Sequence, residues 1–106
     1  MERFKDILQL TANCEITEIV DGELCRWKYI MIHPEDKNYI LAINCFTHNV
    51  DSLSLSSMKR NYFFIGESDV EFIIREKIRQ KEDILELVKR DIQVLYNELK
   101  FYGFKE

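Results

Sequence analysis

The fold is decided by the stretch from Ser68 to Tyr102, which reads SDVEFIIREKIRQKEDILELVKRDIQVLYNELKFY. No proline or glycine interrupts it, and Gly103 follows as a C-terminal stop. Ser68 with Glu71 fits a capping box, in which the two side chains bind early backbone N–H groups. The sequence therefore predicts a helix over residues 68–103, ~50 Å long at 1.5 Å per residue.

The composition of this helix divides it into two halves. Arg75 to Asp83 is polar apart from Ile78, and apolar residues are dense on either side. Five strands spaced about 4.8 Å apart make a sheet only ~25 Å wide, so a straight helix would overhang it. We therefore expect a bend near residues 79–83.

The distal half carries an apolar seam whose steps alternate between three and four residues, the a/d spacing of a coiled coil. A second apolar row recurs every seven residues on a different side of the helix. A surface helix usually needs one apolar face, so two rows suggest contact with two bodies. The seam consists of Leu85, Val88, Ile92, Leu95, Leu99 and Tyr102, and the second row of Leu87, Val94 and Phe101.

Three arrangements could cover these rows. The helix could fold back at the bend, so that both rows pack on the sheet and on an N-terminal helix. Two copies of the chain could pair through the distal half as a homodimer. A groove on a different protein could also receive it.

Upstream, Asp21-Gly22 separates two strand-like runs, 15–20 and 24–32, and suits a tight type I′ hairpin turn. A two-residue loop pairs Val20 with Glu23 and Ile16 with Trp27. Paired residues share a sheet face, and a one-residue slip in the pairing would move the apolar side chains to the opposite face. One face then collects Cys14, Ile16, Cys25, Trp27, Tyr29 and Met31, with Glu18 as the polar exception.

The remaining elements follow from periodicity. Residues 3–11 predict a short N-terminal helix, and residues 38–47 predict a central strand that is apolar, and therefore covered, on both faces. Residues 51–56 alternate as an edge strand does, with a short helix capped by Asp51 as the competing interpretation. A turn over 57–61 and a last strand over 62–65 complete the set.

The predicted fold class is α+β: a short N-terminal helix, an antiparallel meander of four to five strands and the long amphipathic helix. This order is similar to small SH3-like or Sm-like barrels with a curved sheet. The length of 106 residues fits a single domain over 1–106, with helix and sheet in 1–67.

The balance of charged residues limits the classes of partner that the chain could bind. The net charge is −4 and the pI is near 5.2, which argues against coating nucleic acid or anionic membranes through bulk charge. No apolar run reaches the ~20 residues that span a bilayer, and the N-terminus lacks an apolar signal core. The three cysteines fit free thiols in the cytoplasm.

No catalytic or metal-binding pattern stands out. Cys14, Cys25 and Cys45 lack the short spacing of structural zinc sites, so we interpret them as small buried hydrophobic residues. Cys45 and His48 are close in sequence, but sequence distance does not establish a nucleophile–base pair. We therefore expect no catalytic residues, no metal and no cofactor.

A nucleic-acid site is the principal alternative. Lys59, Arg60, Arg75 and Arg79 could form a basic patch, and aromatic residues of the sheet, among them Trp27, could stack on bases. Acidic neighbours dilute the patch, and a small sheet buries its large aromatic residues first. An acidic inhibitor that mimics nucleic acid is a further alternative, although the 15 basic residues are interspersed among the 19 acidic ones.

Residues Asn38 to Ile43, with Ser52 to Leu55 and Lys59-Arg60, resemble the WYL regulatory domain. In that family a Trp-Tyr-Leu strand precedes an arginine-rich strand that contacts nucleic-acid ligands. Tyr39 and Leu41 match the first strand loosely, and serines stand where the family has arginines. The resemblance implies a ligand-binding regulatory domain, but the residues that would bind the ligand are absent.

Taken together, the sequence predicts a small non-catalytic protein-interaction module. The distal helix, residues 85–102, is the predicted contact surface, with homodimer formation favoured over a foreign partner.

Overall fold

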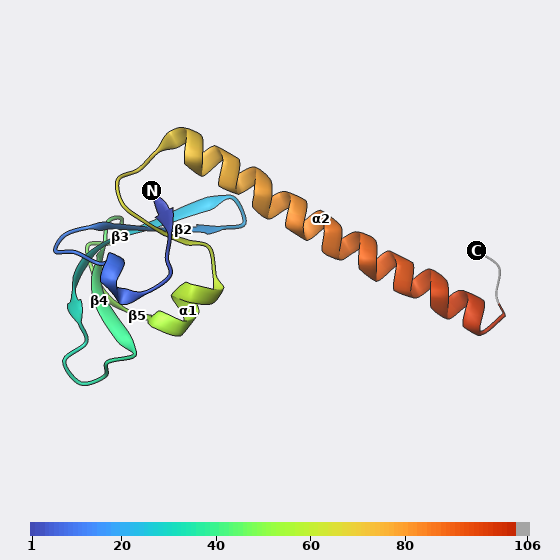
Figure 1. Cartoon of the computed structure of the whole chain (residues 1–106), viewed down its shortest axis with the longest axis horizontal. Coiled ribbons are helices and arrows are strands. Elements are labelled where there is room, and N and C mark those ends of the chain that lie inside the picture. Colours follow the sequence, from blue (N-terminus) through green and yellow to red (C-terminus); the bar gives the residue numbers. More distant parts are fainter. Residues whose placement is uncertain (104–106) are drawn as a thin grey trace. The chain divides into compact units, whose positions relative to one another are not determined.

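The structure is a computed structural model that describes residues 1–103. Its contacts group into two compact units, Met1–Phe72 and Ile73–Glu106. Each unit is described by itself. The first contains the sheet and the second contains most of the long helix α2 (Figure 1). An antiparallel sheet combined with a long C-terminal helix confirms the α+β class.

The central hairpin consists of β2 (Glu15–Val20) and β3 (Glu23–Ile32). Its register pairs Val20 with Glu23 and Ile16 with Trp27, as the turn chemistry predicts. Asp21 and Gly22 both have positive φ angles, 50° and 81°, which a type I′ turn requires. The predicted assignment of side chains to the two faces of the sheet holds as far as Tyr29. A bulge between Tyr29 and Met31 then shifts the register, and Met31 is exposed rather than in the core.

The sheet has six strands in the order β1-β6-β2-β3-β4-β5, so the predicted count of four to five is wrong. The other strands are β1 (Glu2–Arg3), β4 (Tyr39–Asn44), β5 (Val50–Ser54) and β6 (Phe63–Ile65). β6 returns from the far end of the meander and inserts between β1 and β2. This non-local pairing makes β2 an inner strand with neighbours on both sides.

The predicted helix over residues 3–11 is wrong. Arg3 pairs with Phe64 in the sheet, and the backbone N–H of Phe4 donates to the carbonyl of Phe63 over 2.8 Å. Only a single 3₁₀ turn, η1 (Ile7–Gln9), follows, with Asp6 as its N-cap. Sheet pairing and the burial of Phe4, which is 2% exposed, outweigh the helical spacing of the apolar residues.

The segment after β4 combines both interpretations that the sequence left open. The edge strand β5 ends at Ser54, and α1 (Leu55–Arg60) begins there as a helix. Its N-cap is Ser54, whose hydroxyl accepts from the N–H of Ser57, and not Asp51. The predicted turn over 57–61 is therefore mostly helix.

β4 lies inside the sheet as predicted, bonded to β3 and β5. It is covered on one face only. Ile40 and Ala42 are fully buried, whereas Tyr39 and Ile43 on the opposite face are each 39% exposed. The strand stops at Asn44 because its side-chain oxygen accepts from the N–H groups of Phe46 and Thr47 and closes a turn.

The core of the first unit occupies one sheet face, under α1 and the N-terminal segment. Its buried members are Phe4, Ile16, Trp27, Ile40, Ala42, Met58, Phe63 and Ile65. The opposite face is also buried along the central strands, at Thr17, Ile19 and Phe64. The ring of Phe72 contacts Phe64 edge-on, with centroids 5.2 Å apart. Two buried faces explain why the inner strand β2 is apolar on both sides.

The helix α2 (Val70–Phe101) is continuous over 32 residues (Figure 1). Residues 79–83, where we expect a bend, lie within this uninterrupted helix. Its N-cap is Asp69, whose carboxylate accepts from the N–H of Phe72 over 3.1 Å. The predicted cap, Ser68, instead donates its backbone N–H and its hydroxyl to the carboxylate of Glu15.

Candidate interaction surface

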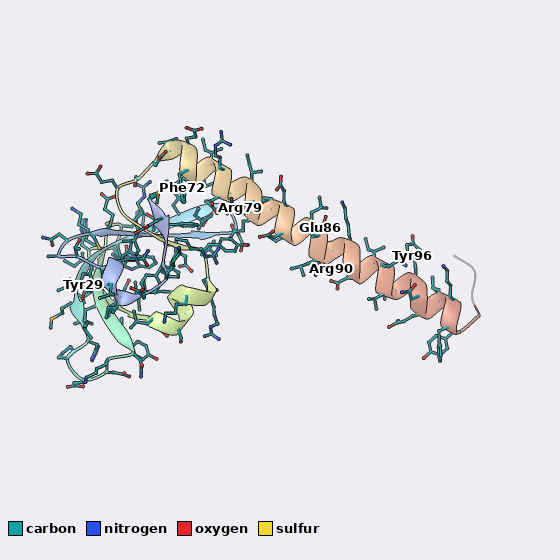
Figure 2. The ribbon with its side chains drawn as sticks, in the orientation of Figure 1. Tyr29, Phe72, Arg79, Glu86, Arg90 and Tyr96 are labelled. Carbon is teal, nitrogen blue, oxygen red and sulfur yellow. The ribbon has the colours of Figure 1, made fainter. Side chains whose placement is uncertain are left out.

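The predicted seam is exposed along the distal half of α2. Leu85 is 53% exposed, Ile92 47% and Leu95 59%. The helix places these residues, with Val88, Leu99 and Tyr102, on one side because steps of three and four residues return to nearly the same angle on a 3.6-residue turn. Side chains project from α2 all along its distal half (Figure 2). The seam is therefore a continuous apolar stripe available to a partner.

Two further apolar side chains border the seam. Ile84 precedes Leu85, and Tyr96 follows Leu95; both are partly exposed, at 46% and 42%. They occupy the g and e positions of the heptads, which flank the a/d core of a coiled coil. The stripe is therefore wider in its middle than the six seam residues alone.

The second row, Leu87, Val94 and Phe101, is exposed as well, at 58%, 55% and 83%. It occupies the c position of each heptad, next to the g position and on the far side of the helix from the e position. At its distal end the rings of Phe101 and Tyr102 meet edge-on at 5.2 Å. Ile84 lies between this row and the seam at one end, and the acidic g residues Asp91 and Glu98 separate the two rows beyond it.

Charged residues separate the apolar rows. Lys89 lies 3.8 Å from Glu86, and both side chains are largely exposed. Arg79 lies 3.2 Å from Glu76 within the same helix. The Lys89–Glu86 pair is exposed and contributes at most about 1 kcal/mol to helix stability, whereas the Glu76 side chain of the other pair is only 7% exposed.

The alternative basic patch is not gathered within one unit. Lys59 and Arg60 lie in the last turn of α1, in the first unit. Arg75 and Arg79 belong to α2 in the second unit. Nor do the sheet aromatics form an open stacking platform: Trp27 and Phe63 stack on each other at 5.9 Å and are both buried. Both rings lie in the core, as predicted from the sequence.

One cavity of ≈ 320 Å³ contains a carboxylate that the sequence did not single out. Glu18 is the polar exception on the core face of β2, and burial raises the pKa of its carboxyl group. Hydroxyl and amide groups from β5 and α1 line the same cavity. Its lining residues are Glu18, Tyr39, Ser52, Leu53, Ser54, Ser57, Met58, Asn61 and Phe63. The only signal in the sequence was the break in face sorting at Glu18.

A second cavity of ≈ 510 Å³ lies beside the β2–β3 hairpin and the turn after β4. Two of its lining residues, Cys25 and Cys45, are exposed free thiols, whereas Cys14 is half-buried. The prediction that all three cysteines are buried is therefore wrong. Its lining residues are Glu23, Leu24, Cys25, Arg26, Asn44, Cys45, Phe46 and Thr47.

Metal and membrane sites were also sought. Among residues 1–103, no three His, Cys, Asp or Glu side chains gather as a metal site would need. Within that same range, every helix is too short or too polar to cross a bilayer.

Comparison with known proteins finds no matching family model, no matching curated protein and no matching solved structure. The resemblance of residues 38–60 to the WYL regulatory domain thus has no counterpart in these comparisons. The function is therefore inferred from the surface of this chain alone.

Proposed function

We propose that this protein is a small, non-catalytic interaction module that associates with itself through the seam of α2. The observation that carries the proposal is the unbroken exposure of the apolar a/d stripe from Leu85 to Leu95. Monomeric proteins seldom leave a long apolar stripe uncovered, so such stripes usually mark contact surfaces.

Helix energetics support the same conclusion. An isolated helix is only marginally stable in water, and most helices in proteins depend on packing of their apolar face. The proximal end of α2 is fixed by the Asp69 cap and by the contact of Phe72 with Phe64. A second helix against the seam would give the distal half the packing that it needs. Association and helix stability should therefore be coupled.

Sedimentation equilibrium of the full chain over a concentration series tests the proposal. We expect the wild-type chain to form a dimer in the micromolar range or below. Val88→Glu places a charge in the centre of the seam, and burial of an unpaired carboxylate should weaken association by more than about a hundredfold.

Val94→Glu is the matched control. It makes the same substitution six residues away, at a position of the second row that is 55% exposed, close to the 47% of Val88. We expect it to leave association within about threefold of wild type, because a c position lies outside the helix–helix contact. Equal loss in both variants, or a wild-type chain that stays monomeric at high concentration, would contradict the proposal.

The exposed thiols of Cys25 and Cys45 support a cytoplasmic location, where the reducing environment keeps thiols free. Binding of labelled single-stranded nucleic acid by wild type, lost in Lys59→Ala with Arg60→Ala, would instead favour the alternative function. We expect no such binding, because the net charge is −4 and the rings of Trp27 and Phe63 are buried.

A further inference from the structure

We propose that two copies of α2 pair in antiparallel orientation, with Leu85 of one copy beside Val88 of the other. This inference rests on the proposed self-association and adds its partner, direction and register. It follows from one polar residue within the seam and from the charges beside it.

The polar residue is Lys81. When the heptads of the seam continue toward the N-terminus, Ile78 falls at an a position and Lys81 at a d position. In a parallel pair each d residue faces its own counterpart, so two Lys81 ammonium groups would meet inside the contact. In an antiparallel pair a positions face d positions, and Lys81 would lie beside Ile92 of the second copy. Its aliphatic stem can then cover Ile92 while its charge reaches water.

The flanking charges select the register. With Leu85 beside Val88, the e position Glu82 lies opposite Lys89 of the second copy. The g position Lys77 lies opposite Glu98. Twofold symmetry repeats each pair, so four ion pairs of opposite sign border the contact. In a parallel pair, the only opposite flanking charges to meet would be Lys77 of one copy and Glu82 of the other. Lys89 would face the uncharged Ile84.

Neighbouring antiparallel registers are disfavoured by like charges. A shift of one heptad in one direction places Lys89 opposite Lys89 and Asp91 opposite Asp91. The opposite shift places Glu82 opposite Glu82. Like charges that face each other are repulsive, and charges at e and g positions set orientation and partner choice in coiled coils. The register centred on Leu85 and Val88 is thus the one in which all the flanking charges that meet are complementary.

The helix is long enough for this contact. The central apolar layers pair Leu85 with Val88. The next layers outward pair Ile78 with Leu95, and the outermost pair Ile74 with Leu99. All of these residues lie within the uninterrupted α2. The overlap covers residues 74–99 of both copies, ~39 Å of helix at 1.5 Å per residue. Continuity of α2 through residues 79–83 is essential, because a break there would divide the contact.

Charge reversal in the full chain tests the direction of pairing. Glu82→Lys and Lys89→Glu should each weaken self-association about tenfold at low salt, because each turns two attractive pairs into repulsive ones. The double variant E82K/K89E restores opposite charges and should return to within about threefold of wild type. An equimolar mixture of the two single variants should form mixed dimers in preference to either homodimer.

The matched control is Arg90→Glu, which makes the same change of charge as Lys89→Glu at the neighbouring outer f position; Arg90 is labelled in Figure 2. Arg90→Glu should associate as wild type does. Circular dichroism of every variant shows whether α2 remains helical, so that loss of pairing is not confused with loss of the helix.

Disulfide formation gives an independent measure of direction. In a background with Cys14→Ala, Cys25→Ser and Cys45→Ser, the antiparallel pair predicts that I92C mixed with K81C cross-links between the two variants. I92C alone should not cross-link. Efficient cross-linking of I92C alone, or a double charge variant that does not recover, would overturn the antiparallel arrangement while leaving self-association intact. A monomeric wild-type chain would overturn both proposals.

Discussion

The indole Nε1–H of Trp27 donates a 2.9 Å hydrogen bond to Oδ2 of Asp51, joining β3 to β5 across the intervening strand β4. The side-chain amide of Asn44, on β4, donates to the same oxygen over 3.4 Å. One carboxylate thus links three strands at the edge of the core. Since Trp27 is only 7% exposed, its N–H has few other partners available.

Asp51→Ala should lower the free energy of unfolding by about 1–3 kcal/mol, because it leaves a buried indole N–H without an acceptor. Urea unfolding followed by the fluorescence of Trp27, the sole tryptophan, measures the change directly. Asp51→Asn keeps one acceptor oxygen and should lose less. Wild-type stability in the alanine variant would show that this bond contributes nothing.

The hydroxyl of Thr17 is buried in the inner strand β2, and within residues 1–103 it has no hydrogen-bond partner. Thr17→Val replaces it with a methyl group of similar shape and should raise the free energy of unfolding by about 1 kcal/mol. Thermal or urea unfolding provides the measurement, and Thr11→Val, at an exposed position, is the control. A loss of stability in Thr17→Val alone would mean that the hydroxyl makes a favourable bond.

The features that sequence predicted correctly are those that neighbouring residues determine. The β2–β3 register followed from Asp21-Gly22 and the alternation around it, and the helix α2 followed from the helical spacing of its apolar residues. Both depend on residues within one turn or one helix. Periodicity could therefore locate the candidate surface, and the side chains around Lys81 could be assigned to heptad positions.

The features that sequence missed depend on partners far along the chain. β1 exists because Arg3 pairs with Phe64, and periodicity cannot indicate such a contact. The bulge that exposes Met31 is likewise set by pairing with β4. Glu18 could be recognised as an exception to face sorting, but the cavity around it needs β5, α1 and β6 in place. Contacts of large sequence separation account for most of the errors.

Glu18→Gln should stabilise the protein at neutral pH. Burial raises the pKa of the Glu18 carboxyl above its ordinary value of 4.5, so the folded state binds the proton more tightly than the unfolded state does. The free energy of unfolding therefore falls as the pH rises from that value through the raised pKa, and the full penalty persists above it. Glutamine removes this penalty because it carries no charge.

Urea unfolding of wild type and Glu18→Gln across the acidic to neutral range measures the difference. The variant's advantage should be largest at neutral pH and should disappear as the pH falls below 4.5, where wild-type Glu18 becomes protonated in both states. Glu23→Gln, at an exposed position of the same hairpin, controls for the loss of one negative charge. A variant that is less stable than wild type at neutral pH would show that the carboxylate has a favourable partner.

The N-cap of α2 is Asp69 in the structure, whereas the sequence predicted Ser68, and substitution of each residue tests which one caps the helix. Asp69→Ala removes the cap that accepts from the N–H of Phe72 and should cost about 1 kcal/mol, with fraying of the first helical turn. Ser68→Ala removes only a 3.4 Å hydroxyl contact with Glu15, and its backbone N–H still donates to that carboxylate over 3.1 Å. Its cost should therefore be smaller.

Amide hydrogen exchange at Phe72, together with urea unfolding, compares the two variants. We expect faster exchange in Asp69→Ala and near wild-type exchange in Ser68→Ala. Asp69→Asn, which retains a good capping oxygen, should recover most of the lost protection. If Ser68→Ala caused the larger loss, the capping box of Ser68 and Glu71 would describe the helix start better than the Asp69 cap does.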